Sequence, residues 1–436
     1  MEKVKMSGHF QSRKPSAIRL AQIEFMKRSD DTEAINTAIG NVSLPMHPAM
    51  QKRMFELGGK ESPFKDGVVK YSATAGIKEC NDAFLNIIAS SGLDTSKLSS
   101  QITDGGSQAM ELVILGCCGD AGTDEKPLLL IDAAYTNYNA MASRVGRKTV
   151  SVSRTLSRDG LFSLPDQQEI ETLIKKHHPG AMVIIPYDNP TGQFMDRQAM
   201  KELAELCVKY NMWMISDEAY RELFYLDKEV SSIWALNDSE VPGIEGRRMS
   251  IETASKVWNA CGLRIGAIVT DNHDFHTKCV AENTANLCSN VIGQYIFGSL
   301  AHEKHSDLRN WYKEQRDYYR PMMFQLNDDL KALLPGIIVS RPDASIYSVV
   351  DVCDIAKEGF DADEFVLFCS QKGSVVIDGV AYTLLAAPMA GFYSIEAGKH
   401  NPGITQMRIA FVEPKDKMAL VPRLFAALFK EFEGNR

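Results

Sequence analysis

The sequence lacks the features of a membrane, secreted or nucleic-acid-binding protein. No apolar run approaches the roughly 18 residues that a spanning helix needs. The opening segment, MEKVKMSGHFQSRK, has no apolar core of the kind found in signal peptides. Basic residues are not in excess, since 48 Lys and Arg face 56 Asp and Glu, for a net charge of −8. We therefore expect a cytoplasmic protein without membrane or nucleic-acid partners.

Cysteine patterns typical of disulfide frameworks and metal sites are also absent. The nine cysteines are an odd number, and they form neither a C-x-x-C pair nor a Cys/His zinc pattern. We expect reduced thiols and no metal site. What the chain does have is an ordinary globular composition, with 44% hydrophobic and 24% charged residues among 436. A chain of this length can bury a large core around a concave site.

Short apolar runs alternate with amphipathic stretches through the middle of the chain. The runs that predict buried strands are 128–131, 182–185, 213–216, 249–251 and 267–269. Between them we expect helices, including one that opens at Gly106 and one over 196–210. This alternation predicts an α/β fold with a large domain, whose mostly parallel sheet is covered by helices on both faces.

The C-terminal part has a different pattern. A strongly helical stretch over 307–334 contains Pro321, which should kink it. Strands are expected over 337–351 and 374–378, and an amphipathic helix over 418–432 closes the chain. These elements predict a smaller α+β domain built from both chain ends. The expected division is an N-terminal segment at 1–60 packing with the small domain, a large domain at 61–318, and the small domain at 319–436.

Two glycine-containing motifs follow predicted strands, at the edge where open α/β sheets bind ligands. Thr103–Gln108 (TDGGSQ) leads into a helix, so its backbone N–H groups and the helix N-terminus favour a phosphate. An ordinary glycine turn would have the same residues, and the motif is neither a Walker A loop nor a GxGxxG fingerprint. Asn189–Gly192 (NPTG) is, taken alone, a common turn.

Two further motifs carry ionisable groups. In Ser216–Tyr220 (SDEAY) a strand ends in two carboxylates, which either cap a helix or pair a buried Asp217 with a cationic ring nitrogen. The segment 253–266 (TASKVWNACGLRIG) places Lys256 after a strand and before apolar residues. Burial and a nearby cation such as Arg264 disfavour the charged form of the Lys256 amine. A lysine that forms a Schiff base needs its amine in the neutral form.

In this order, GGSQ, NPTG, SDEAY and TASKVWNACGLRIG resemble the motifs of the class I/II, fold-type I aminotransferases that depend on pyridoxal phosphate. The resemblance covers most of the chain and extends to the aspartate aminotransferase-like members. It implies pyridoxal 5′-phosphate as the cofactor and a transaminase activity. An amino group would move between an L-amino acid and a 2-oxo acid by a ping-pong mechanism, through an aldimine on Lys256.

The resemblance also implies a role for each matching residue around the cofactor. Lys256 would form the aldimine and move the proton, Asp217 would pair with the ring nitrogen, and Tyr220 would bind the ring oxygen together with Asn189. Tyr135 would stack on the ring. The phosphate ligands would be Gly106, Ser107, Gln108, Thr253, Ser255 and Arg264.

Substrate binding and assembly are implied in the same way. Arg408, in the strand-like segment QMRIAF, would clamp the substrate α-carboxylate, and Gly40 and Asn189 would line the substrate pocket. Tyr71, in YSATAG, matches a tyrosine that reaches the phosphate of a neighbouring subunit. The protein would then be a homodimer with shared active sites.

Some residues depart from the family pattern. Thr253 replaces the usual Ser or Gly three positions before the lysine, although its hydroxyl can still donate. Ser107 stands where bacterial aspartate-type members often carry Lys, and no Arg lies between Arg264 and Arg309. The usual clamps for a distal carboxylate are therefore missing. The segment 384–402, which should border the substrate site, does not follow the family closely.

Other reactions and roles stay open at this level. A C–S lyase, another β-eliminating enzyme or a cyclopropane-forming synthase would use the same cofactor residues. A cofactor-binding regulator would carry an N-terminal helix-turn-helix domain, for which the first sixty residues leave no obvious room. If the protein had a purely structural role, the joint presence of Lys256, Asp217 and Arg408 would be a coincidence.

Overall fold

The computed structural model describes residues 4–120, 122–123, 126–396 and 398–435. Its centre is a seven-stranded sheet in which every strand is parallel to the others except β10, which is antiparallel to both neighbours. The strands, in spatial order, are β2 (Ser99–Thr103), β10 (Gly266–Thr270), β9 (Arg248–Thr253), β8 (Trp213–Asp217), β7 (Ala181–Ile184), β3 (Leu128–Asp132) and β4 (Thr149–Ser153). The five predicted strands are all present in this sheet.

Both faces of the sheet are covered by helices, because alternate side chains of each buried strand point to opposite faces. In β3, Leu128 and Leu130 join one apolar cluster, whereas Leu129 and Ile131 join another. The first cluster includes α5 (Gly105–Cys117), α6 (Asn137–Arg144) and α9 (His273–Asn283). The second includes α4 (Lys78–Ser90), α7 (Gln167–His177), α8 (Arg197–Lys209), α10 (Val291–Gly298) and α11 (His305–Leu333). The predicted α/β architecture is confirmed.

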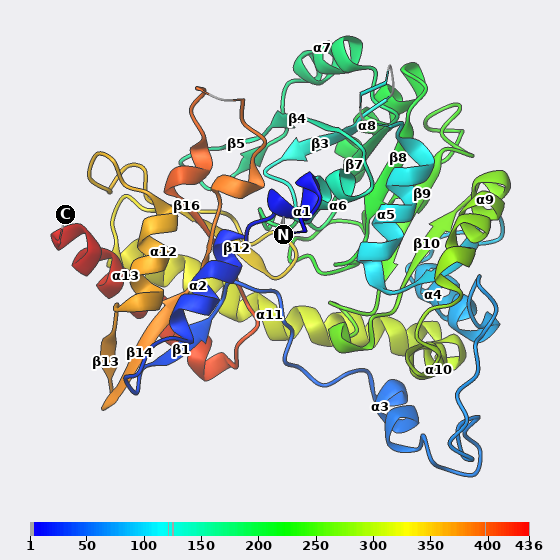
Figure 1. The fold of residues 1–436 in the computed structure, drawn as a ribbon, viewed down its shortest axis with the longest axis horizontal. Coiled ribbons are helices and arrows are strands. Elements are labelled where there is room, and N and C mark those ends of the chain that lie inside the picture. The colour runs from blue at the N-terminus through cyan, green and yellow to red at the C-terminus, as the bar shows by residue number, and fades with distance from the viewer. Residues whose placement is uncertain (1–3, 121, 124–125, 397, 436) are drawn as a thin grey trace.

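A smaller α+β part contains strands from both ends of the chain. One sheet has the order β1 (Glu33–Asn36), β14 (Val380–Leu385), β13 (Val375–Ile377). The other is antiparallel, with β11 (Ile338–Val339), β12 (Tyr347–Asp351), β16 (Gln406–Ala410) and β15 (Ala387–Pro388). Helices α2 (Ala17–Phe25), α12 (Ala362–Gln371) and α13 (Lys415–Gly434) accompany these sheets (Figure 1).

The long helix α11 runs between the two parts in Figure 1. It is one continuous helix with Pro321 inside it. The predicted domain boundary at residue 318 would fall within this helix. The division into domains at 1–60, 61–318 and 319–436 remains a proposal. The parallel pairing of β1 with β14, which places Glu33 opposite Tyr382, is the contact that supports grouping the N-terminal segment with the C-terminal part.

Two local predictions need correction. The expected strand over 337–351 is two strands, β11 and β12, because the chain reverses over 340–346 and the two strands pair as antiparallel neighbours; Pro342, which has no N–H to donate to a sheet, lies in that connection. No helix follows β8, so the helix-capping alternative for Ser216 and Asp217 is wrong. The other short elements include α1 (Gly8–Gln11), α3 (Pro48–Phe55), the hairpin of β5 (Thr155–Leu156) and β6 (Phe162–Ser163), and several single-turn 3-10 helices. None of the helices in the described ranges is both long and apolar enough to cross a membrane.

Candidate active site

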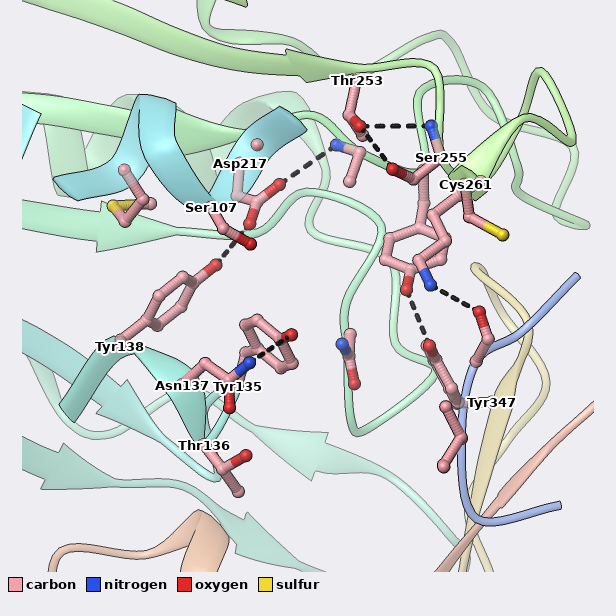
Figure 2. A pocket seen from close by; sticks show the side chains of 18 of the residues that line it. Ser107, Tyr135, Thr136, Asn137, Tyr138, Asp217, Thr253, Ser255, Cys261 and Tyr347 are labelled. Carbon is pink, nitrogen blue, oxygen red and sulfur yellow. Dashed lines mark hydrogen bonds between the residues drawn. The ribbon is translucent and has the colours of Figure 1, made fainter. Parts of the chain in front are cut away.

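A pocket of about 350 Å³ lies where the carboxyl ends of the parallel strands meet the small antiparallel sheet. Of the fourteen predicted site residues, twelve line it: Gly40, Gly106, Ser107, Tyr135, Asn189, Asp217, Tyr220, Thr253, Ser255, Lys256, Arg264 and Arg408. They converge because parallel strands present their carboxyl ends at one edge, and the neighbouring β7, β8 and β9 are followed by the motifs around Asn189, Asp217 and Lys256. Figure 2 shows the pocket at close range, with Asp217, Thr253 and Ser255 among its labelled lining residues.

Asp217 is the last residue of β8 and the only carboxylate that lines the pocket among the residues described. It accepts hydrogen bonds from the Tyr138 hydroxyl at 2.5 Å and from the Ala219 N–H at 3.1 Å (Figure 2). Burial raises the pKa of Asp217, and the hydrogen bond from Tyr138 opposes that rise. A carboxylate held in this way gains stability from a cationic partner such as a protonated ring nitrogen.

Lys256 follows β9 and reaches across the pocket to the segment 38–40. Its amine donates to the carbonyl oxygen of Gly40 at 2.5 Å. A Cβ at Gly40 would collide with the hydroxyl of Tyr347 and lie 3.0 Å from Lys256 Nζ. Glycine is therefore required at this position by the close approach of two functional side chains, not by an ordinary turn.

The features expected of a phosphate site gather at the start of α5. Gly106 and Ser107 lie in its first turn, and the neighbouring Thr253 donates to the Ser255 hydroxyl at 2.8 Å. A Cβ at Gly105, where φ is +79°, would lie 2.6 Å from Arg264 Nη2. The Arg264 guanidinium makes no ion pair with any described carboxylate and donates only to the Cys261 carbonyl, at 3.0 Å. A helix N-terminus, three hydroxyls and a guanidinium without an ion pair among the described residues form a donor set for a dianion.

Arg408 lies on β16 and is 4% exposed. Its guanidinium donates to Asn189 Oδ1 at 2.8 Å and to the Ala38 carbonyl at 2.7 Å, while its Nε finds no hydrogen-bond partner among the residues described. No carboxylate in the described part of the chain pairs with it. A buried arginine held only by neutral groups is costly unless an anion binds there, so the geometry favours a carboxylate ligand.

The structure adds aromatic residues that no motif indicated. The Tyr347 ring lies 4.3 Å from the Arg408 guanidinium carbon, and the Phe392 ring lies 5.1 Å from it. Tyr347 also shares a 2.7 Å hydrogen bond with Tyr220. The sequence signal for Tyr347 was only its place in a predicted strand. Its contact with the site follows from the pairing of β12 with β16, which sets Val349 opposite Arg408.

The two paired phenols differ in acidity. Burial raises the pKa of Tyr220, and neighbouring Tyr347 adds to this rise. Burial would also raise the pKa of Tyr347, but the cations Lys256 and Arg408, together with the hydrogen bond from Tyr220, lower it further than burial raises it. Tyr220 and Asn189, predicted to bind the cofactor ring oxygen, are thus engaged here with Tyr347 and Arg408 at the pocket wall.

Two predicted residues lie outside the pocket. The Gln108 side chain accepts from the Asp104 N–H at 2.6 Å and donates to Asn283 at 3.2 Å, so it joins α5 to the end of α9. Its predicted contact with the phosphate stays a prediction. Tyr71 is 78% exposed and closely follows Val68 and Val69, which are also exposed. Its predicted reach to a neighbouring subunit is likewise untested by a single chain.

The divergent segment 384–402, apart from residue 397, connects the two parts of the protein at the pocket. The Phe392 carbonyl accepts from the Ala134 N–H at 3.0 Å, and the Ser394 N–H donates to Asp132 at 2.6 Å. The segment thereby holds the chain around Tyr135 against the small sheet. No cluster of three or more metal-ligating side chains occurs among the residues that the structure places.

Comparison with known proteins gives one consistent family. A family model described as aminotransferase class I and II matches residues 60–388. A probable aspartate/prephenate aminotransferase of Aquifex aeolicus is 26% identical over 357 residues, which cover 80% of this chain and 85% of the relative. The aspartate/prephenate aminotransferase of Thermus thermophilus is 24% identical and covers 86% and 91%.

Solved structures show the same fold. A kynurenine aminotransferase of Pyrococcus horikoshii, in complex with PMP, superposes with a TM-score of 0.78 at 20% identity, over 98% of this chain and 97% of that one. The N-succinyldiaminopimelate aminotransferase of Mycobacterium tuberculosis superposes with a TM-score of 0.79 at 19% identity, over 97% and 100%.

Proposed function

The chain belongs to the class I and II aminotransferases, and from this premise we propose how its own residues carry out amino-group transfer. The protein is a pyridoxal-phosphate-dependent transaminase acting on an amino acid and a 2-oxo acid. The observation that carries the assignment of roles is that Lys256, Asp217 and the buried, unpaired Arg408 line one pocket. An amine, an acid and an anion site are the three groups that this reaction requires.

The donor set of the pocket fits pyridoxal phosphate. When bound, this cofactor supplies an aldehyde that accepts an amine and a cationic ring that withdraws electrons from the substrate α-carbon. Asp217 would hold the protonated ring nitrogen, and Tyr135 would cover the ring face. The start of α5, with Ser107, Thr253, Ser255 and Arg264, would hold the phosphate.

Lys256 and Arg408 divide the work on the substrate. Arg408 binds the α-carboxylate and so orients the α-carbon toward Lys256. The amine of Lys256 removes the proton from the α-carbon as a general base and donates it again as a general acid. Gly40, whose carbonyl accepts from Lys256 Nζ, keeps the amine within the pocket between these events. The first amino acid would leave as its 2-oxo acid after hydrolysis, with its amino group retained on the bound cofactor, and a second 2-oxo acid would take that amino group by the reverse sequence, which gives ping-pong kinetics.

The transamination assay is the direct test of this function. Oxo-acid formation from a panel of L-amino acids is expected to depend on an added 2-oxo acid acceptor. Initial rates at several acceptor concentrations should give parallel double-reciprocal lines. Release of ammonia or pyruvate without an acceptor would instead indicate C–S lyase or other β-elimination chemistry, although the relatives named above are all aminotransferases.

A homodimer with shared sites is the assembly that we propose. It is supported by Tyr71, Val68 and Val69, which leave an exposed apolar group on the loop before α4. Sedimentation is expected to give twice the chain mass. Tyr71→Phe should weaken cofactor binding about tenfold, as loss of a hydrogen bond to a charged phosphate would.

Tyr382→Phe, on β14 and away from the pocket, is the control for the Tyr71 variant and should bind the cofactor normally. A monomeric protein whose Tyr71→Phe variant binds the cofactor as tightly as wild type would contradict the shared site.

A cytoplasmic location is also proposed. Its support is that all nine cysteines are free and most of them are buried, as is usual in a reducing compartment.

A further inference from the structure

The pocket has one more cation than the proposed function uses. Its charged lining residues, among those described, are Arg19, Asp217, Lys256, Arg264 and Arg408. The cofactor and the substrate α-carboxylate account for all of them except Arg19. A positive side chain at the pocket wall raises the local concentration of anions and disfavours cations.

Arg19 comes from the N-terminal helix α2, which forms part of the pocket wall. Ser16 caps this helix, and Ser16, Ile18 and Arg19 all line the pocket. Ile18 packs against an apolar cluster that includes Ala38 and Phe392. The same Ala38 accepts a hydrogen bond from Arg408 through its carbonyl, so α2 is anchored on the wall that carries the α-carboxylate site.

The Arg19 guanidinium is available to bind a ligand. Its one side-chain hydrogen bond within the described ranges runs from Nη1 to Gln22 Oε1, at 3.0 Å, which leaves its other N–H groups free. No acidic side chain in those ranges forms an ion pair with it. Arg28, just beyond the same helix, is by contrast paired with Asp30 at 2.6 Å.

We propose that Arg19 binds the distal carboxylate of the substrate, so that the preferred amino acids and 2-oxo acids are dicarboxylic. This inference rests on the proposed function, since Arg408 and Lys256 must hold the α-carboxylate and the amine. The substrate side chain then points to the remaining wall. The two positions from which family members usually bind a distal carboxylate carry no cation here: one is Ser107, and the other lies in the arginine-free stretch between Arg264 and Arg309. Arg19 supplies a cation from a different element, helix α2.

The test compares ligands that carry a distal carboxylate with ligands that lack it. Arg19→Ala is expected to lower kcat/KM for glutamate about tenfold and to leave kcat/KM for glutamine within about twofold. In calorimetry on the holoenzyme, glutarate should bind the variant about tenfold more weakly than wild type, whereas butyrate should bind both alike. Arg19→Lys should restore part of the affinity, because it keeps the charge without the planar fork.

Arg13→Ala is the matched control, since Arg13 is an exposed arginine of the same segment that does not line the pocket. It should behave as wild type in every assay. Rising salt should narrow the difference between wild type and Arg19→Ala for glutarate. Equal losses for glutamate and glutamine, or no loss for either, would overturn the assignment of Arg19. Absence of transfer from every amino acid in the wild type would instead refute the proposed function.

Discussion

Lys256→Ala is expected to lower the rate of amino-group transfer by about 10⁴-fold or more, the largest effect of any single substitution in the pocket. The variant loses both the amine that attaches to the cofactor and the base that moves the α-proton. Stopped-flow mixing of the cofactor-loaded variant with an amino acid should measure the loss. Mass spectrometry after borohydride reduction should find no cofactor on the chain.

Two comparisons make the Lys256 experiment specific. Lys256→Arg keeps a cation but provides no base near neutral pH, so it should be about as slow as the alanine variant. The thermal unfolding of Lys256→Ala should stay close to that of wild type, because, within the described part of the chain, the side chain makes a single hydrogen bond, to the Gly40 carbonyl. An alanine variant that transfers amino groups at the wild-type rate would refute the mechanism.

Asp217→Asn is expected to lower kcat/KM by about 10²- to 10⁴-fold while keeping the shape of the side chain. The neutral amide cannot stabilise a protonated ring nitrogen, so the bound cofactor would lose much of its electron-withdrawing effect. The loss of kcat/KM should come mainly from a lower kcat, with KM little changed, since Arg408 would still bind the α-carboxylate. Steady-state kinetics over a range of both substrates would measure the change.

The same substitution should stabilise the protein when no cofactor is bound. Burial raises the pKa of Asp217 above its ordinary value of 3.8, so the folded state holds this proton more tightly than the unfolded state does. Wild-type stability therefore falls as the pH rises from about 3.8 through the folded pKa, and the asparagine variant is free of that loss.

At pH 7 the cofactor-free variant should unfold about 1–3 °C higher than the cofactor-free wild type, and the difference should shrink toward pH 3.8. Calorimetry on both proteins at a series of pH values would measure it. Equal unfolding temperatures at pH 7 would mean that the Tyr138 hydrogen bond fully compensates burial. A lower unfolding temperature for the variant would contradict the expected sign.

The cofactor side of the site could be predicted from the sequence because its signals are local. Asn189, Asp217 and Lys256 each follow an apolar strand within a few residues, and parallel strands bring their carboxyl ends to one edge. The order of the motifs along the chain added the family. Gly40 was predicted only through the family resemblance, whereas the structure shows its close approach to Lys256 and Tyr347.

The substrate side depended on contacts between distant parts of the chain. Arg408 meets Asn189 and Ala38, which lie 219 and 370 residues away in sequence. Tyr347 reaches Tyr220 across 127 residues. No spacing rule predicts such pairs, because they follow from strand pairing and from how the two parts of the molecule pack.

The sequence by itself thus determined the α/β fold, because strand periodicity is a short-range property, and the order of its motifs indicated the family and, through that resemblance, the cofactor and the proposed role of Lys256. Only the tertiary structure decided which side chains complete the pocket. Arg19 illustrates the difference: in the sequence it is one of several arginines near the N-terminus, and it becomes part of the site only because Ile18 packs α2 against the apolar cluster around Phe392. Burial of an apolar face, not a motif, places that charge at the pocket.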